Sequence, residues 1–357
     1  MKTLIFHDYL SNIGGGEKLM LTLARGLQAD IATLDFDQKI VAELGYGDVN
    51  IIPLGNTIKI PPLKQISASL THSLADYRKD YDFFIFSGNW SHYASKKHHP
   101  NLWYCHTPVR AFYSDYQRIL KTLPILKRIP FKLWASIHRR FDQKAVKQVD
   151  KIITNSKNTQ ERIQKAYKRT SEIVYPCVDT TKYKFIKSGD FYLSVNRLYP
   201  EKRIELQFEA FEKMPDQKLV LVGGNLPGDN SQKYAEKLLK NKPENVQYLG
   251  KVTEEELIKL YGQCKAHITT AYDEDFGMTP IEAMSCGKPT IAPHEGGYIE
   301  SITEDTGILI KPEVEEIINA IQQINKDPGK YKIACQQRAQ KFDTQKFIQE
   351  IKNKIKK

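Results

Sequence analysis

Short apolar runs alternate with longer amphipathic stretches along most of the chain. The runs are rich in β-branched and aromatic residues, which is typical of buried strands. They cover residues 3–8, 82–88, 102–106, 151–156, 191–197, 218–224, 246–250, 266–271 and 289–293. Helical patterns lie between them, as in 17–27 and 253–264. Alternation of this kind predicts parallel sheets with right-handed crossovers, and therefore doubly wound α/β architecture.

The series of strands starts twice, and KSGD (187–190) between the two halves has the composition of a linker. We therefore expect a first Rossmann-like domain at 1–187 and a second at 188–340. A basic helix at 341–357 is expected to return to the first domain. Two such domains would face a central cleft at the carboxyl ends of their strands, where open α/β sheets bind ligands.

The size and composition of the chain exclude fewer classes of function than the pattern of apolar and polar positions does. The 357 residues carry a formal charge of +11, which suits nucleic acid, an anionic membrane, a phosphorylated small molecule or a solvated surface equally well. No basic recognition motif favours nucleic acid. The five cysteines form no C-x-x-C pair, so neither a disulfide framework nor a zinc site is indicated. There is no signal-peptide core and no apolar run of about 20 residues, so we expect a cytoplasmic protein.

The stretch EDFGMTPIEAMSCGKP (274–289) follows a predicted strand. Thr279 has the position of a helix N-cap, with Pro280 as the first helical residue. Glu282 stands three residues after Thr279, which is the spacing of a capping box. A simple interpretation is therefore that Glu282 only caps its own helix. That interpretation leaves residues 274–278 without a role.

Those residues suit a ligand that carries a phosphate between hydroxyl groups. Gly277 lets the backbone approach a ligand closely. The amides of Met278 and Thr279 would point outward at a helix N-terminus, which favours phosphate. The flanking Glu274 and Glu282 repel phosphate but accept hydrogen bonds from hydroxyls. Hydroxyls on both sides of a phosphate describe a sugar nucleotide, with a ribose on one side and a hexose on the other.

The stretch resembles the E-x7-E motif of family 4 retaining glycosyltransferases, which have the GT-B fold. The resemblance implies that Glu274 contacts the hexose hydroxyls of the donor and that Glu282 binds its ribose. It also implies that the amides of Phe276 through Thr279 hold the sugar and the diphosphate.

SVNRLYPEKRIEL (194–206) follows the first strand of the second half and resembles the family's GRL-x-x-x-K segment. The resemblance places Arg197 and Lys202 at the diphosphate. Without a metal, a departing diphosphate needs fixed cations. The alternative is that both side chains are ordinary solvated cations.

YCHTPVRAFYSDY (104–116) resembles the family's HTP stretch, which implies that His106 contacts the transferring sugar. A satisfied structural histidine is the alternative. NIGGGEKLM (12–20) joins a strand to a helix and resembles the family's GGAE loop. Its Gly15 and Gly16 let the loop pack against a diphosphate or an acceptor. Glycine-rich turns are also common for purely structural reasons.

Two further segments of the second half have counterparts in the family. YLGKVTEEEL (248–257) resembles the loop that lies against the base, and so implicates Lys251 and Val252. LVGGNLPG (221–228) matches the family's VG-x-G loosely, and only Gly223 is carried over.

Residues 118–147 contain nine Lys or Arg and one acidic residue, Asp142. Ile129, Leu133, Ile137 and Phe141 recur at every fourth position among these cations, which predicts a basic amphipathic helix. Either the apolar stripe packs into the first domain and the cations face water, or the helix forms a patch that meets an anionic bilayer.

We therefore expect a metal-independent, retaining hexosyltransferase that uses a nucleoside diphosphate sugar and no cofactor. Mannose from GDP-mannose leads over UDP-linked sugars, because HTPVRAFYSDY is most similar to stretches of mannosyltransferases. The acceptor would be a glycan or a lipid-linked sugar at the inner face of the plasma membrane. A GT-B sugar-nucleotide epimerase and a non-catalytic sugar-nucleotide-binding protein are the alternatives.

Overall fold

The computed structural model describes residues 1–11, 14–225 and 231–356. The chain forms two compact units, one of residues 1–176 with 347–357 and the other of residues 177–346. The division falls before the expected boundary at residue 187, so residues 177–187 belong to the second unit. Their backbone explains this, because the N–H groups of Ile186 and Lys187 both donate to the carbonyl of Gly262.

The first unit contains a parallel sheet of seven strands in the order β3-β2-β1-β4-β5-β6-β7. These strands are β1 (Thr3–Tyr9), β2 (Asp30–Leu34), β3 (Ile51–Pro53), β4 (Phe83–Ser87), β5 (Asn101–Cys105), β6 (Lys151–Thr154) and β7 (Glu172–Ile173). Their middle members are buried on both faces, which accounts for continuous apolar runs such as FFIFS in β4.

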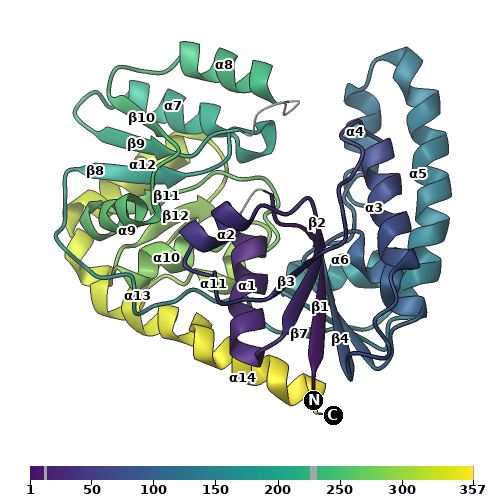
Figure 1. Cartoon of the computed structure of the whole chain (residues 1–357). Coiled ribbons are helices and arrows are strands. Elements are labelled where there is room, and N and C mark those ends of the chain that lie inside the picture. The colour runs from purple at the N-terminus through teal and green to yellow at the C-terminus, as the bar shows by residue number, and fades with distance from the viewer. Residues whose placement is uncertain (12–13, 226–230, 357) are drawn as a thin grey trace. The chain divides into compact units, whose positions relative to one another are not determined.

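The helices of the first unit lie on both faces of this sheet (Figure 1). They are α1 (Gly15–Leu27), α2 (Gln38–Glu43), α3 (Leu63–Leu74), the 3₁₀ helix η1 (Ser91–Lys96), α4 (Tyr116–Thr122), α5 (Ile125–Val146) and α6 (Lys157–Tyr167). The last helix, α14 (Thr344–Ile355), begins in the second unit and ends in the first. There Phe347 packs edge-on against Tyr104 of β5, with 5.9 Å between the ring centroids.

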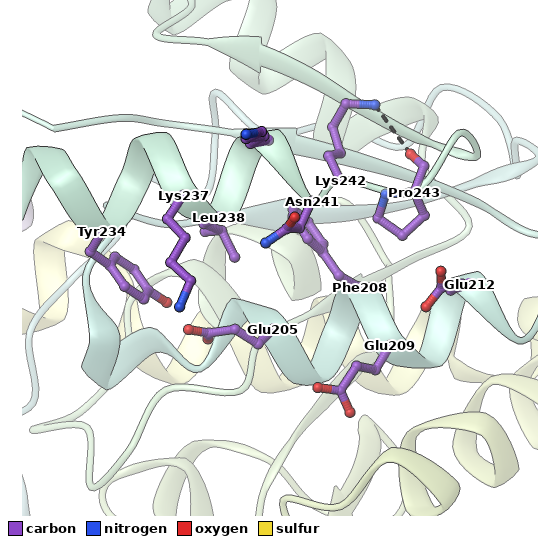
Figure 2. Close-up of a pocket in the computed structure, with 11 residues that line it drawn as sticks. Glu205, Phe208, Glu209, Glu212, Tyr234, Lys237, Leu238, Asn241, Lys242 and Pro243 are labelled. Carbon is purple, nitrogen blue, oxygen red and sulfur yellow. Dashed lines mark hydrogen bonds between the residues drawn. The ribbon is translucent and has the colours of Figure 1, made fainter.

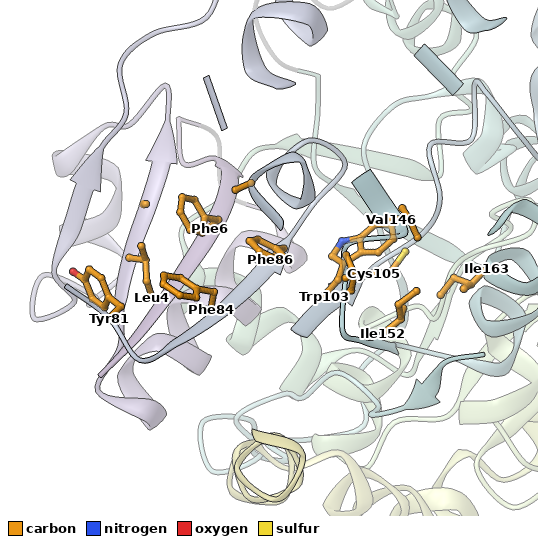
Figure 3. Close-up of a cluster of buried hydrophobic side chains, with 13 residues drawn as sticks. Leu4, Phe6, Tyr81, Phe84, Phe86, Trp103, Cys105, Val146, Ile152 and Ile163 are labelled. Atoms are coloured by element: carbon orange, nitrogen blue, oxygen red, sulfur yellow. The ribbon is translucent and has the colours of Figure 1, made fainter. Parts of the chain in front are cut away.

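Alternate residues of the central strands point to one face of the sheet and form a core (Figure 3). Phe6 of β1, Phe86 of β4 and Trp103 of β5 contribute the largest side chains, and Val146 of α5 packs with them. The intervening Tyr104 points to the opposite face, where α14 lies. This two-residue period fixes which strand ends can present side chains to a ligand.

The second unit contains a parallel sheet of six strands in the order β10-β9-β8-β11-β12-β13. They are β8 (Phe191–Val195), β9 (Lys218–Val222), β10 (Val246–Gly250), β11 (Ala266–Ile268), β12 (Thr290–Pro293) and β13 (Gly307–Ile310). Helix α7 packs with α12, while α10 packs with α9 and α13.

The helices of this unit are η2 (Pro200–Lys202), α7 (Ile204–Glu212), α8 (Gln232–Lys240), α9 (Glu254–Gln263), α10 (Thr279–Ser285), α11 (Tyr298–Ser301), α12 (Val314–Lys326), η3 (Pro328–Tyr331), α13 (Lys332–Ala339) and η4 (Gln340–Phe342). Both units are thus doubly wound α/β folds, as the alternation of patterns predicts.

Helix α5 packs against the first unit with the face that its hydrophobic pattern does not predict. The expected inward stripe is exposed to solvent: Ile129 by 77%, Leu133 by 62%, Ile137 by 45% and Phe141 by 56%. The buried face carries Ala135, His138, Asp142 and Val146 instead. The interpretation that the stripe packs into the first domain is therefore wrong.

Polar partners explain why this face can be buried. Asp142 accepts hydrogen bonds from His92 Nε2 (2.9 Å) and from the Tyr113 hydroxyl (2.6 Å). The ring of His138 stacks on Phe112, with 5.6 Å between the centroids. Buried polar groups with such partners do not carry the full cost of desolvation. A pattern based on hydrophobicity alone cannot identify this face.

Candidate active site

The second unit has a topological switch point beside β8. The chain runs from β8 to β9 and β10 on one side and returns to place β11 on the other side. Ligands of open α/β sheets bind where two such connections diverge, at the carboxyl ends of the strands. The segment after β8 carries Arg197 and Lys202, and the segment after β11 carries Glu274. The structure therefore brings the two strongest sequence motifs of this half to the same end of the sheet, where Lys202 contacts Glu274.

Lys202 and Glu274 form an ion pair across this switch point. Lys202 Nζ lies 2.5 Å from Glu274 Oε2, and the two side chains are 21% and 25% exposed. Both are open enough to exchange partners with a ligand. Arg197 is exposed, and no hydrogen bond or ion pair involves its side chain within the described chain. The structure thus provides one cation in contact with the predicted hexose-binding carboxylate and a second cation that is unengaged.

Arg203, which the sequence analysis did not single out, fastens the segment that carries Lys202. Its Nε donates to the carbonyl of Thr270 (2.7 Å), and its Nη2 pairs with the carboxylate of Glu295. The hydroxyl of Thr270 donates to the carbonyl of Lys202 at 2.7 Å. Arg203 has φ +47°, the left-handed conformation that ends the turn. These bonds lock the ends of β8 and β11 together, so Lys202 has a fixed base.

The loop 274–278 packs tightly on the segment that follows β12. Gly277 has φ +85°, and a Cβ there would lie 2.4 Å from Cε1 of Tyr298. A Cβ on Gly297 would lie 2.3 Å from the Cα of Phe276. The N–H of Gly297 also donates to the carbonyl of Glu274 at 2.8 Å. The packing of Tyr298 against this loop therefore requires a glycine at position 277, whether or not a ligand also approaches the loop. Two consecutive glycines after a strand, Gly296 and Gly297, were the signal that could have identified this support.

The start of α10 presents unpaired backbone donors. The N–H groups of Gly277, Met278 and Thr279 have no hydrogen-bond partner within the described residues. The helix begins at Thr279 with Met278 as N-cap, and no side chain caps it. The prediction that Thr279 is the N-cap of a capping box is therefore wrong. The first turn closes through bonds from Ile281 and Glu282 to the Met278 carbonyl instead.

Glu282 projects toward α9 and accepts a hydrogen bond from the Tyr261 hydroxyl at 2.7 Å. Tyr261 is fully buried, and its burial next to this carboxylate raises its pKa. The hydroxyl therefore remains a donor at any physiological pH. The Tyr183 hydroxyl also hydrogen-bonds to Glu282, so two buried tyrosines hold this carboxylate in place.

Gly223, at the end of β9, permits a very close approach to β8. It has φ +124°, and a Cβ would lie 2.0 Å from the backbone oxygen of Asn196. Its N–H donates to the carbonyl of Gly250 (2.8 Å), and its carbonyl accepts from Tyr248 (3.0 Å). The ends of β8, β9 and β10 are thereby held side by side. Lys251 is exposed and Val252 partly exposed directly after β10.

The first unit brings His106 to the end of β5, beside its own switch point. His106 Nε2 is 2.9 Å from the Ser87 hydroxyl, which is 3.2 Å from His7 Nδ1. Ser87 ends β4 and His7 lies in β1, so three adjacent strands contribute one chain of polar groups. Burial lowers the pKa of His106 and of His7 to about 4. Both imidazoles are therefore neutral near pH 7. Sequence analysis missed Ser87 and His7, which lie inside ordinary apolar runs.

The glycine-rich loop between β1 and α1 ends next to His106. Residues 12 and 13 of NIGGGEKLM lie outside the described residues. Gly15 and Gly16 begin α1, where Glu17 accepts from the N–H of Gly14 at 2.8 Å. A Cβ on Gly16 would lie 3.7 Å from Cε1 of His106. The structure thus places Gly16 in contact range of His106, within the first unit.

Protonation of buried histidines should make the protein labile to acid. Burial lowers the folded-state pKa of His7 and His106 to about 4. It lowers the pKa of His72 and His267 to about 3. The unfolded chain then binds more protons than the folded one below pH 6.5, so stability is complete above 6.5 and is lost as the pH falls toward 4. We expect the free energy of unfolding to fall by an amount on the order of several kcal/mol between pH 7.5 and pH 5, measured by urea unfolding at pH 7.5, 6 and 5.

His72 provides a matched check of this expectation. Both of its ring nitrogens are buried and without a hydrogen-bond partner within the described chain. His72→Phe removes the proton-binding group and retains a ring that can pack against Phe6. The variant should show a shallower pH dependence than the parent protein. An equally steep curve would contradict the assignment of acid lability to this group.

One pocket of the second unit lies away from these residues. It has a volume of about 600 Å³ and lies between α7 and α8 (Figure 2). Glu205 and Glu209 of α7 line it opposite Lys237 of α8. None of the predicted site residues lines it, so it takes no part in the site described above.

Within residues 1–11, 14–225 and 231–356, no His, Cys, Asp and Glu side chains form a group of three or more suited to a metal ion. Across the same ranges, no helix has both the length and the apolar character to cross a membrane.

Two family models match the two halves of the chain. Residues 179–342 match the family model "Glycosyl transferases group 1", and residues 13–182 match the model "Glycosyltransferase Family 4". The alpha-1,3/1,6-mannosyltransferase ALG2 of Candida glabrata is 26% identical over the whole of this chain and 93% of its own length. ALG2 of Dictyostelium discoideum is 28% identical over 72% of this chain and 70% of its own length.

Among solved structures, HepE of Anabaena in complex with UDP and glucose is similar over 99% of both chains. The TM-score is 0.79 at 20% sequence identity, a similarity that shows the fold. Two Rossmann-like units with this match constitute the GT-B fold. The two models together match residues 13–342, so this protein consists of a family 4 domain and a group 1 domain of glycosyltransferases.

Proposed function

We propose that the protein transfers mannose from GDP-mannose to a hydroxyl of a glycan or lipid-linked acceptor, with retention of configuration and without a metal. The second unit binds the donor and the first unit binds the acceptor. Lys202 and Arg197 neutralise the departing diphosphate, aided by the free amides of Gly277 to Thr279. Glu274 and His106 orient the hexose. The mannosyltransferase relatives support the choice of sugar, and the neighbour solved with UDP and glucose is the reason to test UDP-glucose as well.

The Lys202–Glu274 ion pair is the observation that carries this proposal. A sugar 1-phosphate carries a negatively charged phosphate group and several hydroxyl groups on one sugar ring. A cation and a hydroxyl-accepting carboxylate in direct contact suit that combination. Unpaired N–H groups beside them supply further donors for the phosphate oxygens. In the proposed mechanism the phosphate leaves on the face that the acceptor hydroxyl attacks and helps to take its proton, so no covalent intermediate forms.

A ligand panel tests the donor assignment. A donor at about 100 times its dissociation constant should stabilise the fold by about 2.7 kcal/mol. We expect the largest rise in melting temperature with GDP-mannose, compared with UDP-glucose, UDP-N-acetylglucosamine and an ADP-sugar. Turnover in the presence of EDTA, and the anomeric configuration of the product by NMR, test the metal and stereochemical parts. No shift with any sugar nucleotide would refute the proposal, and a new epimer formed without acceptor would assign an epimerase instead.

The exposed stripe of α5 supports peripheral contact with an anionic membrane at the cytoplasmic face. Leu126, Ile129, Leu133 and Ile137 expose apolar side chains along one face of this helix. Exposed Lys127, Lys132, Arg140 and Lys144 flank them. Apolar side chains that enter a bilayer boundary beside cations that meet anionic headgroups are the two components of interfacial binding. A lipid-linked acceptor would be reached from this surface.

Binding to vesicles containing phosphatidylglycerol should depend on this stripe. Ile129→Glu/Leu133→Glu is expected to weaken co-sedimentation at least about 10-fold, because two apolar side chains are lost and two repelling charges are gained. The control Ile299→Glu/Ile333→Glu changes two exposed isoleucines of the second unit and should leave binding within about twofold of the wild type. Equal binding by both variants, or self-association through α5 without vesicle binding, would contradict the membrane assignment.

A further inference from the structure

A second pocket in the first unit has a chemistry that the donor site does not account for. Its volume is about 420 Å³, within the range of small-molecule sites. Its walls are formed by the loop after β5 and by helices α4, α5 and α6. It is lined by Pro108, Phe112, Tyr113, Ser114, Tyr116, Gln117, Arg139, Arg162, Lys165 and Ala166.

The lining contains three cations, Arg139, Arg162 and Lys165, and no carboxylate. Two nearby carboxylates have partners of their own. Asp115 binds Arg118 at 2.6 Å, and Asp142 binds His92 and Tyr113. Glu161 lies 3.6 Å from Lys165, but both side chains are more than two-thirds exposed, so this pair is weak. The side chains that line the pocket thus carry positive charge and no negative charge, a composition that attracts an anion.

The cations are positioned by the protein. Arg162 is only 8% exposed, and its Nη1 donates to the Thr107 hydroxyl at 3.1 Å. The guanidinium of Arg139 bonds to the Phe112 carbonyl and lies 5.1 Å from the centroid of the Tyr116 ring. Its Nε is buried and has no hydrogen-bond partner within the described residues. An ordered guanidinium with an unused donor favours an oxyanion ligand.

The aromatic walls and the location indicate what carries the anion. Phe112, Tyr113 and Tyr116 offer apolar ring faces, and the bond to Asp142 holds Tyr113 in place. Thr107 and Pro108 follow His106 directly, so the pocket opens beside the loop of the proposed sugar site. Arg139 belongs to the same helix as the exposed apolar stripe.

We infer that this pocket binds the phosphate or diphosphate group that links an acceptor's sugar to its lipid. The inference rests on the proposed function, because it presupposes an acceptor of that class. Arg139, Arg162 and Lys165 bind the phosphate oxygens, the rings pack along the first part of the lipid chain, and the sugar extends toward His106. The three cations thus select a phosphorylated acceptor over a neutral glycan.

Binding of octyl phosphate to the full chain saturated with GDP tests the inference, since GDP removes the diphosphate site as a competitor. Arg139→Gln/Lys165→Gln should raise the dissociation constant at least about 10-fold, because two charged hydrogen bonds are lost. Lys79→Gln/Lys96→Gln removes the same charge from exposed positions of the first unit outside the pocket and should change it by less than about twofold. Equal losses in the two variants, or none, would overturn the inference.

Three further ligands identify the source of the phosphate. Octanol should bind at least about 10-fold more weakly than octyl phosphate to the wild type. Inorganic phosphate as the tightest ligand, or displacement of octyl phosphate by phosphatidylglycerol vesicles, would replace the acceptor with a free anion or a membrane headgroup and refute the inference. GDP-mannose binding measured in parallel should be unchanged in Arg139→Gln/Lys165→Gln. The donor proposal and this one can therefore fail separately.

Discussion

Replacing Lys202 with alanine is expected to lower the turnover number by about 10²–10³-fold, the usual cost of losing one group that stabilises developing charge. Two effects act in the same direction. The departing diphosphate loses a fixed cation at the end of β8. In addition, Glu274 loses its 2.5 Å cationic partner, so its negative charge is less well neutralised beside the leaving group. GDP-mannose should bind more weakly, but by a smaller factor, because the charge on the diphosphate grows as the bond breaks.

Initial-rate kinetics and calorimetry of GDP-mannose separate these two effects. Lys213→Ala is the matched control, because it breaks another Lys–Glu pair of the second unit, 2.6 Å from Glu315 and fully on the surface. Its kinetics should stay within about twofold of the wild type. A Lys202→Ala enzyme that retains more than about a tenth of the wild-type turnover number would remove Lys202 from the mechanism.

The double variant Lys202→Ala/Glu274→Ala refines the interpretation. If the two side chains act on one bound sugar phosphate, the double variant should lose about as much as the more damaging single variant. Strictly additive losses would mean that the two groups act independently. The ion pair seen in the structure would then be incidental to transfer.

The fold could be predicted from the sequence because its sheets are parallel and buried. Strands covered on both faces become continuous apolar runs, and the crossover helices become amphipathic stretches between them. The position of the domain boundary could not be predicted in this way. KSGD has the composition of a linker, but the backbone of its first residue, Lys187, and of the preceding Ile186 bonds to Gly262. Such a bond joins residues distant in sequence and leaves no local signal.

The segments proposed to bind the donor could be identified from the sequence because their residue types have few alternative explanations. A glycine and two carboxylates at fixed spacing point to a ligand, and the structure places Glu274 beside Lys202. Arg203 and Ser87 carry no comparable signal. Arg203 differs from a surface cation only through its bonds to Thr270 and Glu295. Ser87 differs from other strand residues only because His106 lies 2.9 Å away. Supporting residues are defined by neighbours that sequence spacing does not reveal.

Gly223→Ala is expected to destabilise the second unit by about 3 kcal/mol or more. Its φ of +124° is strained for any residue with a Cβ, and that atom would meet the backbone oxygen of Asn196 at 2.0 Å. Backbone atoms cannot rotate away as a flexible side chain can. The ends of β8 and β9 would have to separate, which moves Asn196 and the neighbouring Arg197. Donor affinity should therefore fall together with stability.

The variant Gly250→Ala distinguishes the two causes of this loss of stability, which are backbone strain and the clash of the new Cβ. It also has a positive φ, +68°, but among the described residues no atom beyond its two chain neighbours lies within 4 Å of the position of its Cβ. Gly250→Ala should therefore cost only the conformational strain, about 1 kcal/mol, and leave GDP-mannose affinity within about twofold. Urea unfolding and calorimetry of the two variants measure both quantities. If Gly223→Ala is no less stable than Gly250→Ala, the close approach of β9 to β8 contributes nothing, and Gly223 has to be explained by direct contact with the donor.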